Sequence, residues 1–196
     1  MRSWLPICVA LTLCGCNMVH SDRPLFTTAD AVGAPRFKPG VWAAPDQGCE
    51  FDPNLPVKTW PDCAHGEAGT KGEPGMELLV AAGNPLVLQY GGKGDDGTST
   101  SSPNYYYFGL EAPSLDNRGW ITAINPWPVA CGPPRRYGQH YRGPKGTRHP
   151  WPGLTMDVDG NNCTAESPAA VRAAAILSRP KGRIPAAAYW VRDGDR

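Results

Sequence analysis

The chain has no long hydrophobic run and almost no net charge. Its apolar run over residues 5–13 is about half of the roughly twenty residues that a membrane-spanning helix needs, so no such helix is expected there. The 19 Lys and Arg residues and 18 Asp and Glu residues give a formal net charge of +1. The strong basic surplus typical of nucleic-acid-binding proteins is missing. We therefore expect no nucleic-acid partner.

The motifs of common catalytic and cofactor sites are also missing. No GxSxG, HExxH, GxGxxG or P-loop pattern is present. There is no CxxC pair and no nearby histidine pair, which disfavours zinc. The four histidines are scattered over predicted loops: His20, His65, His140 and His149. We expect no enzymatic activity, no cofactor and no metal.

One pair of aspartates has a spacing close to that of the catalytic carboxylates of a hydrolase. Asp157 and Asp159 would share a face of an extended strand about 6.6 Å apart, near the spacing that an inverting glycosidase uses. However, Asp159-Gly160-Asn161 is typical of a turn, in which aspartate binds its own backbone. The pattern favours the turn, and a carboxylate-dependent hydrolase stays the weaker alternative.

The first sixteen residues have the layout of a secretory signal. Arg2 precedes the short apolar run, which ends in Leu13-Cys14-Gly15-Cys16. This ending resembles the lipobox of bacterial lipoproteins. The resemblance implies cleavage after residue 15 and acylation of Cys16, which anchors the chain in a membrane. It also implies, with Asn17 rather than Asp in second place, the inner leaflet of the outer membrane, facing the periplasm.

The remaining chain is long enough for one domain. Residues 16–40 lack sustained periodicity, which predicts a flexible tether, and a flexible chain of this length spans about 25–30 Å. The domain is then expected over residues 41–196, from Val41-Trp42 onward. The whole chain has 23 Gly and 22 Pro, so the domain should be rich in loops, and it should be folded because aromatic residues occur throughout.

Four cysteines follow the signal: Cys49, Cys63, Cys131 and Cys163. An even number in an exported protein indicates disulfides, and four cysteines allow three pairings. Closing a short loop costs less entropy than closing a long one. This favours Cys49–Cys63 and Cys131–Cys163 without excluding the other pairings.

The fold expected is α+β. Strands are predicted over 76–82 and 85–90, around a Gly83-Asn84 turn, and over 105–112, 119–125, 154–158 and 189–192. One helix is predicted over 168–178, with Ser167 as N-cap and Pro168 at its first position. Its apolar stripe is expected at Ala170, Ala173, Ala174 and Leu177. We expect a small antiparallel sheet, a single C-terminal helix packed on it, and disulfides that stabilise both.

Several short runs resemble a set of uncharacterised proteobacterial lipoproteins. They are Pro39-Gly40-x-Trp42, Cys49-x-Phe51-Asp52, Trp60-Pro61-x-Cys63 and Trp190-Val191-Arg192-Asp193-Gly194. The resemblance touches about half the chain. It supports the class of protein and implies no activity or ligand.

Two features could bind a ligand. Residues 135–149 contain five cations and no acid: Arg135, Arg136, Arg142, Lys145 and Arg148. Such a segment is usually a solvated loop, but it could bind an anionic envelope component such as peptidoglycan or lipopolysaccharide. The proline-flanked tryptophans Trp60, Trp127 and Trp151 could bind sugars or peptides, although core packing is favoured.

The function expected is therefore non-catalytic binding or a structural role at the cell envelope. The partners would be the membrane, through the N-terminal lipid, and an anionic envelope component or an envelope protein. An inhibitor of envelope hydrolases is the alternative, with the polar 91–103 loop as its protruding element.

Overall fold

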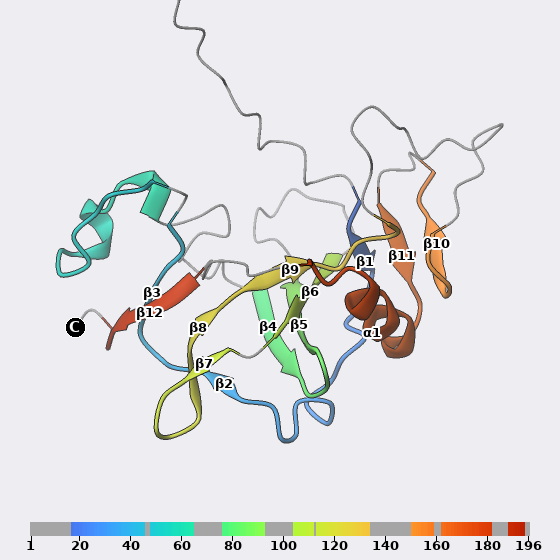
Figure 1. Ribbon diagram of the computed structural model, residues 1–196, viewed down its shortest axis with the longest axis horizontal. Helices are drawn as coiled ribbons and strands as arrows, with labels where there is room; N and C mark the ends of the chain where they lie inside the picture. Colours follow the sequence, from blue (N-terminus) through green and yellow to red (C-terminus); the bar gives the residue numbers. More distant parts are fainter. Residues whose placement is uncertain are drawn as a thin grey trace, which may run out of the picture.

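The computed structural model describes residues 17–45, 48–64, 76–92, 104–111, 113–133, 150–158, 162–181 and 188–194. These residues form two β-sheets and one α-helix, as Figure 1 shows. The smaller sheet lies to one side of the larger, and the helix lies at the opposite side. The structure is mostly β, so the α+β expectation holds only in its coarse form.

The larger sheet has seven strands in the order β10-β11-β1-β6-β5-β4, with β9 also paired to β6. The pairing is antiparallel except between β1 and β11, which run parallel. Its strands are β1 (Val19–Ser21), β4 (Met76–Ala81), β5 (Leu86–Gly92), β6 (Asn104–Leu110), β9 (Pro126–Pro128), β10 (Leu154–Met156) and β11 (Cys163–Ala165).

The smaller sheet has five strands in the order β2-β8-β12-β3, with β7 also paired to β8. Its strands are β2 (Arg36–Phe37), β3 (Val41–Ala43), β7 (Ser114–Leu115), β8 (Trp120–Ile124) and β12 (Ala188–Arg192). Two 3-10 turns, η1 (Val57–Thr59) and η2 (Asp62–Ala64), follow β3. The expected single small antiparallel sheet is therefore wrong: there are two sheets, and each contains one parallel pair.

The predicted hairpin and the later strands are confirmed. β4 and β5 pair in register on either side of the Gly83-Asn84 turn. β8 and β10 lie within the ranges predicted for them, and β6 and β12 overlap theirs but begin one residue earlier. The short strands β1, β2, β3, β7, β9 and β11 were not predicted, because two or three residues are too few to show an alternating pattern.

The helix α1 (Pro168–Leu177) begins as predicted, with the Ser167 hydroxyl accepting a bond from the Ala170 amide at 3.3 Å. Its buried face is Ala170, Val171, Ala174 and Ala175. Ala173 and Leu177 are exposed, so the predicted stripe is wrong by a small rotation of the helix. Nor does the helix end the chain, since β12 follows it.

Tight packing between the larger sheet and the helix fixes that rotation. The Trp127 indole is 4% exposed and donates to the Ala175 carbonyl at 3.1 Å. The ring fits because it lies over Gly109, where a Cβ would come within 2.2 Å of it. Trp60 is likewise 5% exposed, so both tryptophans fill the core as expected.

The expected tether over residues 16–40 is wrong for the residues described. Val19 in β1 is fully buried between β11 and β6, and Phe26 packs edge-on against Tyr107 in the largest core cluster. Buried Gln89 accepts the amides of Leu25 and Phe26, both at 2.9 Å. The folded domain therefore includes residues ahead of Val41, among them β1 and Phe26.

The two favoured disulfides are both present. Cys49 and Cys63 are joined across a separation of 14 residues, and Cys131 and Cys163 across 32. Cys131 and Cys163 lie within the largest core cluster beside β1, whereas the Cys49 pair packs on the small cluster formed by Ala43, Trp60 and Ala64.

Candidate functional site

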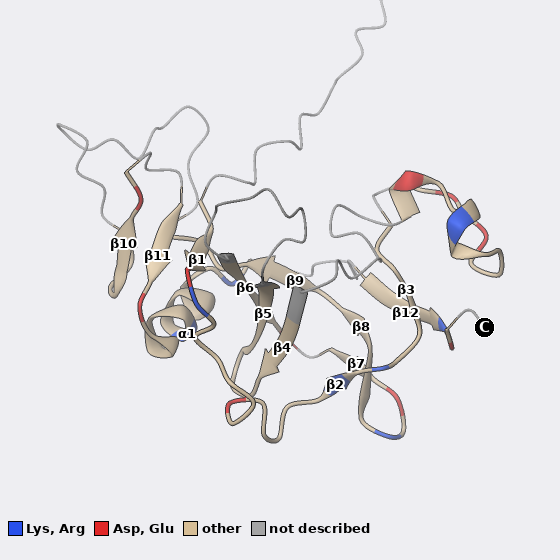
Figure 2. Ribbon diagram, turned by 180° about the vertical axis from the view of Figure 1, so that it is seen from behind, with Lys and Arg blue, Asp and Glu red and all other residues tan. Residues whose placement is uncertain are grey.

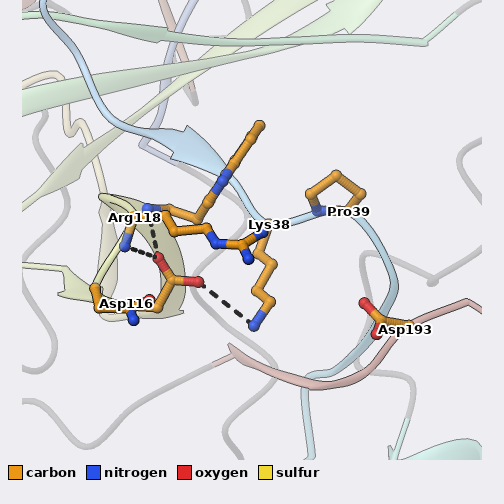
Figure 3. Close-up of a pocket in the computed structure, with 7 residues that line it drawn as sticks. Lys38, Pro39, Asp116, Arg118 and Asp193 are labelled. Atoms are coloured by element: carbon orange, nitrogen blue, oxygen red, sulfur yellow. Dashed lines mark hydrogen bonds and ion pairs between the residues drawn. The ribbon is translucent and has the colours of Figure 1, made fainter.

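A polar cleft lies at the end of the smaller sheet where β8 begins and β12 ends (Figure 3). Its volume is about 470 Å³, within the range of small-molecule sites. It is formed by the segment after β2, the β7–β8 turn and the residue after β12. The lining residues are Lys38, Pro39, Asp116, Asn117, Arg118, Trp120 and Asp193.

Asp116 organises the turn that forms one wall of the cleft. Its Oδ1 accepts the amides of Arg118 at 2.9 Å and Trp120 at 3.0 Å, and Gly119 donates to its carbonyl. Its Oδ2 lies 3.4 Å from Lys38 Nζ. Burial alone would raise the pKa of Asp116, but the two amides and Lys38 outweigh it and lower that pKa below 3.8. The carboxylate is therefore fixed and ionised at neutral pH.

Lys38 is held in place from two sides. Its backbone amide donates to the carbonyl of Ile121 in β8 at 3.0 Å. Its ammonium lies 3.7 Å from the centre of the Trp190 ring, a cation–π contact. The Trp190 indole donates in turn to the Pro39 carbonyl at 3.0 Å. This arrangement fixes a cation at the centre of the cleft.

Gly40 allows the segment after β2 to pack closely against β12 beside the cleft. Its φ of +134° is a backbone conformation that other residues rarely adopt. A Cβ there would lie 2.3 Å from the Arg192 carbonyl oxygen and 2.6 Å from the Trp190 indole nitrogen. The segment after β2 can therefore approach β12 closely only with glycine at this position.

The cleft is formally neutral but its charges are separated. In the view of Figure 3, Lys38 lies between Asp116 and Asp193. Arg118 is exposed and, among the residues that the structure describes, its guanidinium has no ion-pair partner. A planar donor group next to the fixed carboxylate of Asp116 and a partly exposed Trp120 can bind a ligand with hydroxyl and carboxylate groups.

The residues that support the lipoprotein resemblance pack together around the disulfide loop and β12. Trp60 packs against Phe51, with ring centres 4.8 Å apart, next to the Cys49–Cys63 disulfide. The Arg192 guanidinium donates to the carbonyls of Pro53 and Leu55. These contacts join the disulfide loop to β12, the strand that directly precedes the cleft residue Asp193, so they have a structural role.

Most of the predicted binding residues lie outside the described residues. This applies to Cys16, to Arg135, Arg136, Arg142, Lys145 and Arg148, to Asp159, and to all of the 91–103 loop after Gly92. Their roles stay predictions. Trp151 is partly buried against the largest core cluster.

His20 is not in a loop, as had been expected, but in β1. Its Nε2 lies 2.8 Å from Asp157 Oδ2, and Thr164 donates to the other carboxylate oxygen at 3.1 Å. Asp157 follows β10 directly and joins β1 to the β10–β11 pair. With its oxygens bound in this way, Asp157 has a structural role there.

The sequence interpretation missed the cleft. Asp116-Asn117-Arg118-Gly119 is a turn sequence between two strands, and this pattern alone could have placed the turn. Nothing local indicates that Lys38 and Asp193, 155 residues apart in the chain, would line the same cavity.

Comparisons with known proteins give no relative for this chain: no family model, no curated protein and no solved structure matches it. The resemblance to uncharacterised lipoproteins therefore stays an expectation from the sequence. Within the described residues, no helix is both long enough and apolar enough to cross a bilayer.

Proposed function

We propose that this protein is a lipid-anchored, non-catalytic binding protein of the cell envelope, and that the cleft is its ligand site. The anchor would be acylated Cys16, from the Leu13-x-Gly15-Cys16 motif. Asn17 after it favours the outer membrane, facing the periplasm. The observation that supports binding is the cleft itself, in which rigid elements hold Lys38 and Asp116 beside the exposed Arg118.

The chemistry of the cleft suits a carboxylated sugar. Arg118 offers paired donors to a carboxylate, and Asp193 and Asn117 offer acceptors to hydroxyl and amide groups. The Trp120 ring offers an apolar surface to the face of a sugar ring. Peptidoglycan fragments combine sugar rings, amides and carboxylates, so they are the envelope component that we favour.

The state of Asp116 does not suit a general acid. A general acid must be protonated near the working pH, which requires a raised pKa. Asp116 has the opposite shift, and its oxygens are already occupied by the Trp120 and Arg118 amides and by Lys38. Its role is to shape the turn.

Calorimetric titration with a soluble peptidoglycan fragment tests the proposal. The protein would be made with Cys16→Ser, so that it is not acylated. We expect binding, and at least about a tenfold loss of affinity in Arg118→Ala, because a charge-assisted hydrogen bond contributes about 1.5–3 kcal/mol. Arg23→Ala, at an exposed position outside the cleft, is the matched control. Equal affinities for the two variants, or no binding at all, would reject the cleft as the site.

A further inference from the structure

The N-terminal end of the described chain is fastened into the fold. The Asn17 and Met18 amides donate to Asn162 Oδ1 at 3.2 and 3.0 Å. The Asn17 carbonyl accepts the Cys131 amide at 3.0 Å. Val19, two residues on, is fully buried. The position of Asn17 relative to the domain is therefore fixed.

This leaves no length for a tether after the proposed lipid. Cys16 precedes Asn17 directly, and consecutive Cα atoms are only about 3.8 Å apart. A flexible segment of the length first expected would have allowed about 25–30 Å of reach. An acyl group on Cys16 would thus hold the domain against the bilayer surface at the start of β1.

The surface around this point suits contact with a bilayer. Asp157 donates its amide to the Asn162 carbonyl at 3.0 Å, so the residues after β10 lie beside Asn17. Val158 follows and is fully exposed. Among the described residues next to Val158, the acid Asp157 is hydrogen-bonded to His20 and Thr164. An exposed apolar side chain at the point where the acylated N-terminus would meet the bilayer fits the membrane interface.

The cleft lies at the other end of the molecule. Figures 1 and 2 both show the start of β1 and the end of β10 at one end, with β2, β7 and the β7–β8 turn at the opposite end. We propose that the surface formed by Asn17, Asn162 and Val158 sits directly on lipid headgroups, and that this seating directs the cleft into the aqueous space. The inference rests on the proposed acylation of Cys16.

Energy transfer from the protein to the membrane tests this seating. The acylated full-length protein would be reconstituted in vesicles of phosphatidylethanolamine and phosphatidylglycerol that contain a headgroup-labelled acceptor. A donor dye would be attached at Val158→Cys or, as the matched far position, at Ser114→Cys in β7; both residues are exposed. A second pair of variants would have about twenty Gly and Ser residues between Cys16 and Asn17, which gives about 25 Å of reach.

We expect transfer from position 158 to be several-fold greater than from position 114, and the inserted linker to remove most of that difference. Equal transfer from the two positions without the linker, with acylation verified by intact mass, would overturn the seating. A mass that shows no acyl chains would instead reject the anchor in the proposed function. The two failures are thus distinguishable.

Discussion

At the scale of single residues, Asp116 links the charge of the cleft to its shape. Its pKa is lowered below 3.8, so the ionised form stabilises the fold at neutral pH, and this contribution is lost as the pH falls through the lowered folded-state pKa. In Asp116→Asn the side chain keeps an acceptor oxygen for the turn but loses the charge beside Lys38. We expect the variant to be less stable than the original protein at neutral pH.

The difference should shrink as the medium is acidified below about pH 4, where the unfolded chain begins to bind a proton at Asp116, and it should be lost once the pH falls through the lowered pKa of Asp116 in the folded protein. Urea denaturation of both proteins across this pH range measures it. Asp22→Asn, at an exposed position outside the cleft, is the control. A difference between Asp116→Asn and the original protein that stays constant with pH would show that the charge of Asp116 does not stabilise the fold.

Gln89 makes a second prediction at this scale. It is 2% exposed, accepts the Leu25 and Phe26 amides, and donates to the Phe26 carbonyl at 3.1 Å. Gln89→Leu would leave these buried groups unpaired, at a cost of about 1–3 kcal/mol for each buried group. We expect a loss of about 3 kcal/mol or more in the free energy of unfolding, measured with urea.

Thr155→Val, the same kind of change at an exposed strand position, should alter stability by less than about 0.5 kcal/mol. If Gln89→Leu has an equally small effect, the residue 25–26 segment does not depend on Gln89. The sequence could not show this role: glutamine is usually exposed, and its partners lie more than 60 residues away.

At the scale of elements, the sequence showed the long strands and the helix but not the short strands. β5 and β6 have seven residues each and pair along their whole length, so their patterns are readable. β1 has three residues and β2 has two, and each is kept in place by neighbours distant in the chain. The helix cap could be predicted because Ser167 and Ala170 are close in the sequence. The buried face of the helix could not, because it depends on packing against Trp127, which is distant in the sequence.

The N-terminal segment can be tested as an element of the core. Phe26 is 1% exposed and packs on Tyr107, and truncating such a side chain costs about 3–5 kcal/mol. We expect Phe26→Ala to lower the free energy of unfolding by that amount. Val32→Ala lies in the same segment at a position 77% exposed and should have little effect. Equal, small effects would restore the tether interpretation.

At the scale of the whole molecule, the spacing of the cysteines correctly favoured the two short-span disulfides. No feature of the sequence predicted that the strands form two sheets. The chain passes from the smaller to the larger sheet between Ile124 and Pro126, and nothing near these residues indicates a change of sheet. The cleft depends on this arrangement, since it needs β2, β8 and β12 side by side. The disulfides were predictable because closure entropy depends on spacing alone.

The two disulfides should stabilise different parts of the molecule. Cys131–Cys163 lies in the core that joins β1, β6 and α1, whereas Cys49–Cys63 belongs to the small cluster beside β3 and β12. Removing a native disulfide typically costs about 2–5 kcal/mol. We expect the Cys131→Ala, Cys163→Ala double variant to lose stability throughout the larger sheet.

The Cys49→Ala, Cys63→Ala double variant should lose protection mainly over residues 41–64 and 188–192. Hydrogen exchange read by mass spectrometry distinguishes the two patterns, because local opening exposes amides only where contacts are lost. Each double variant is the control for the other. If both raise exchange equally across the whole molecule, the two sheets unfold as one unit, and the cleft is as stable as the core. If only the second variant raises exchange in β12, then the cleft wall formed by Asp193 depends on the Cys49–Cys63 loop, through the bonds that Arg192 makes to Pro53 and Leu55.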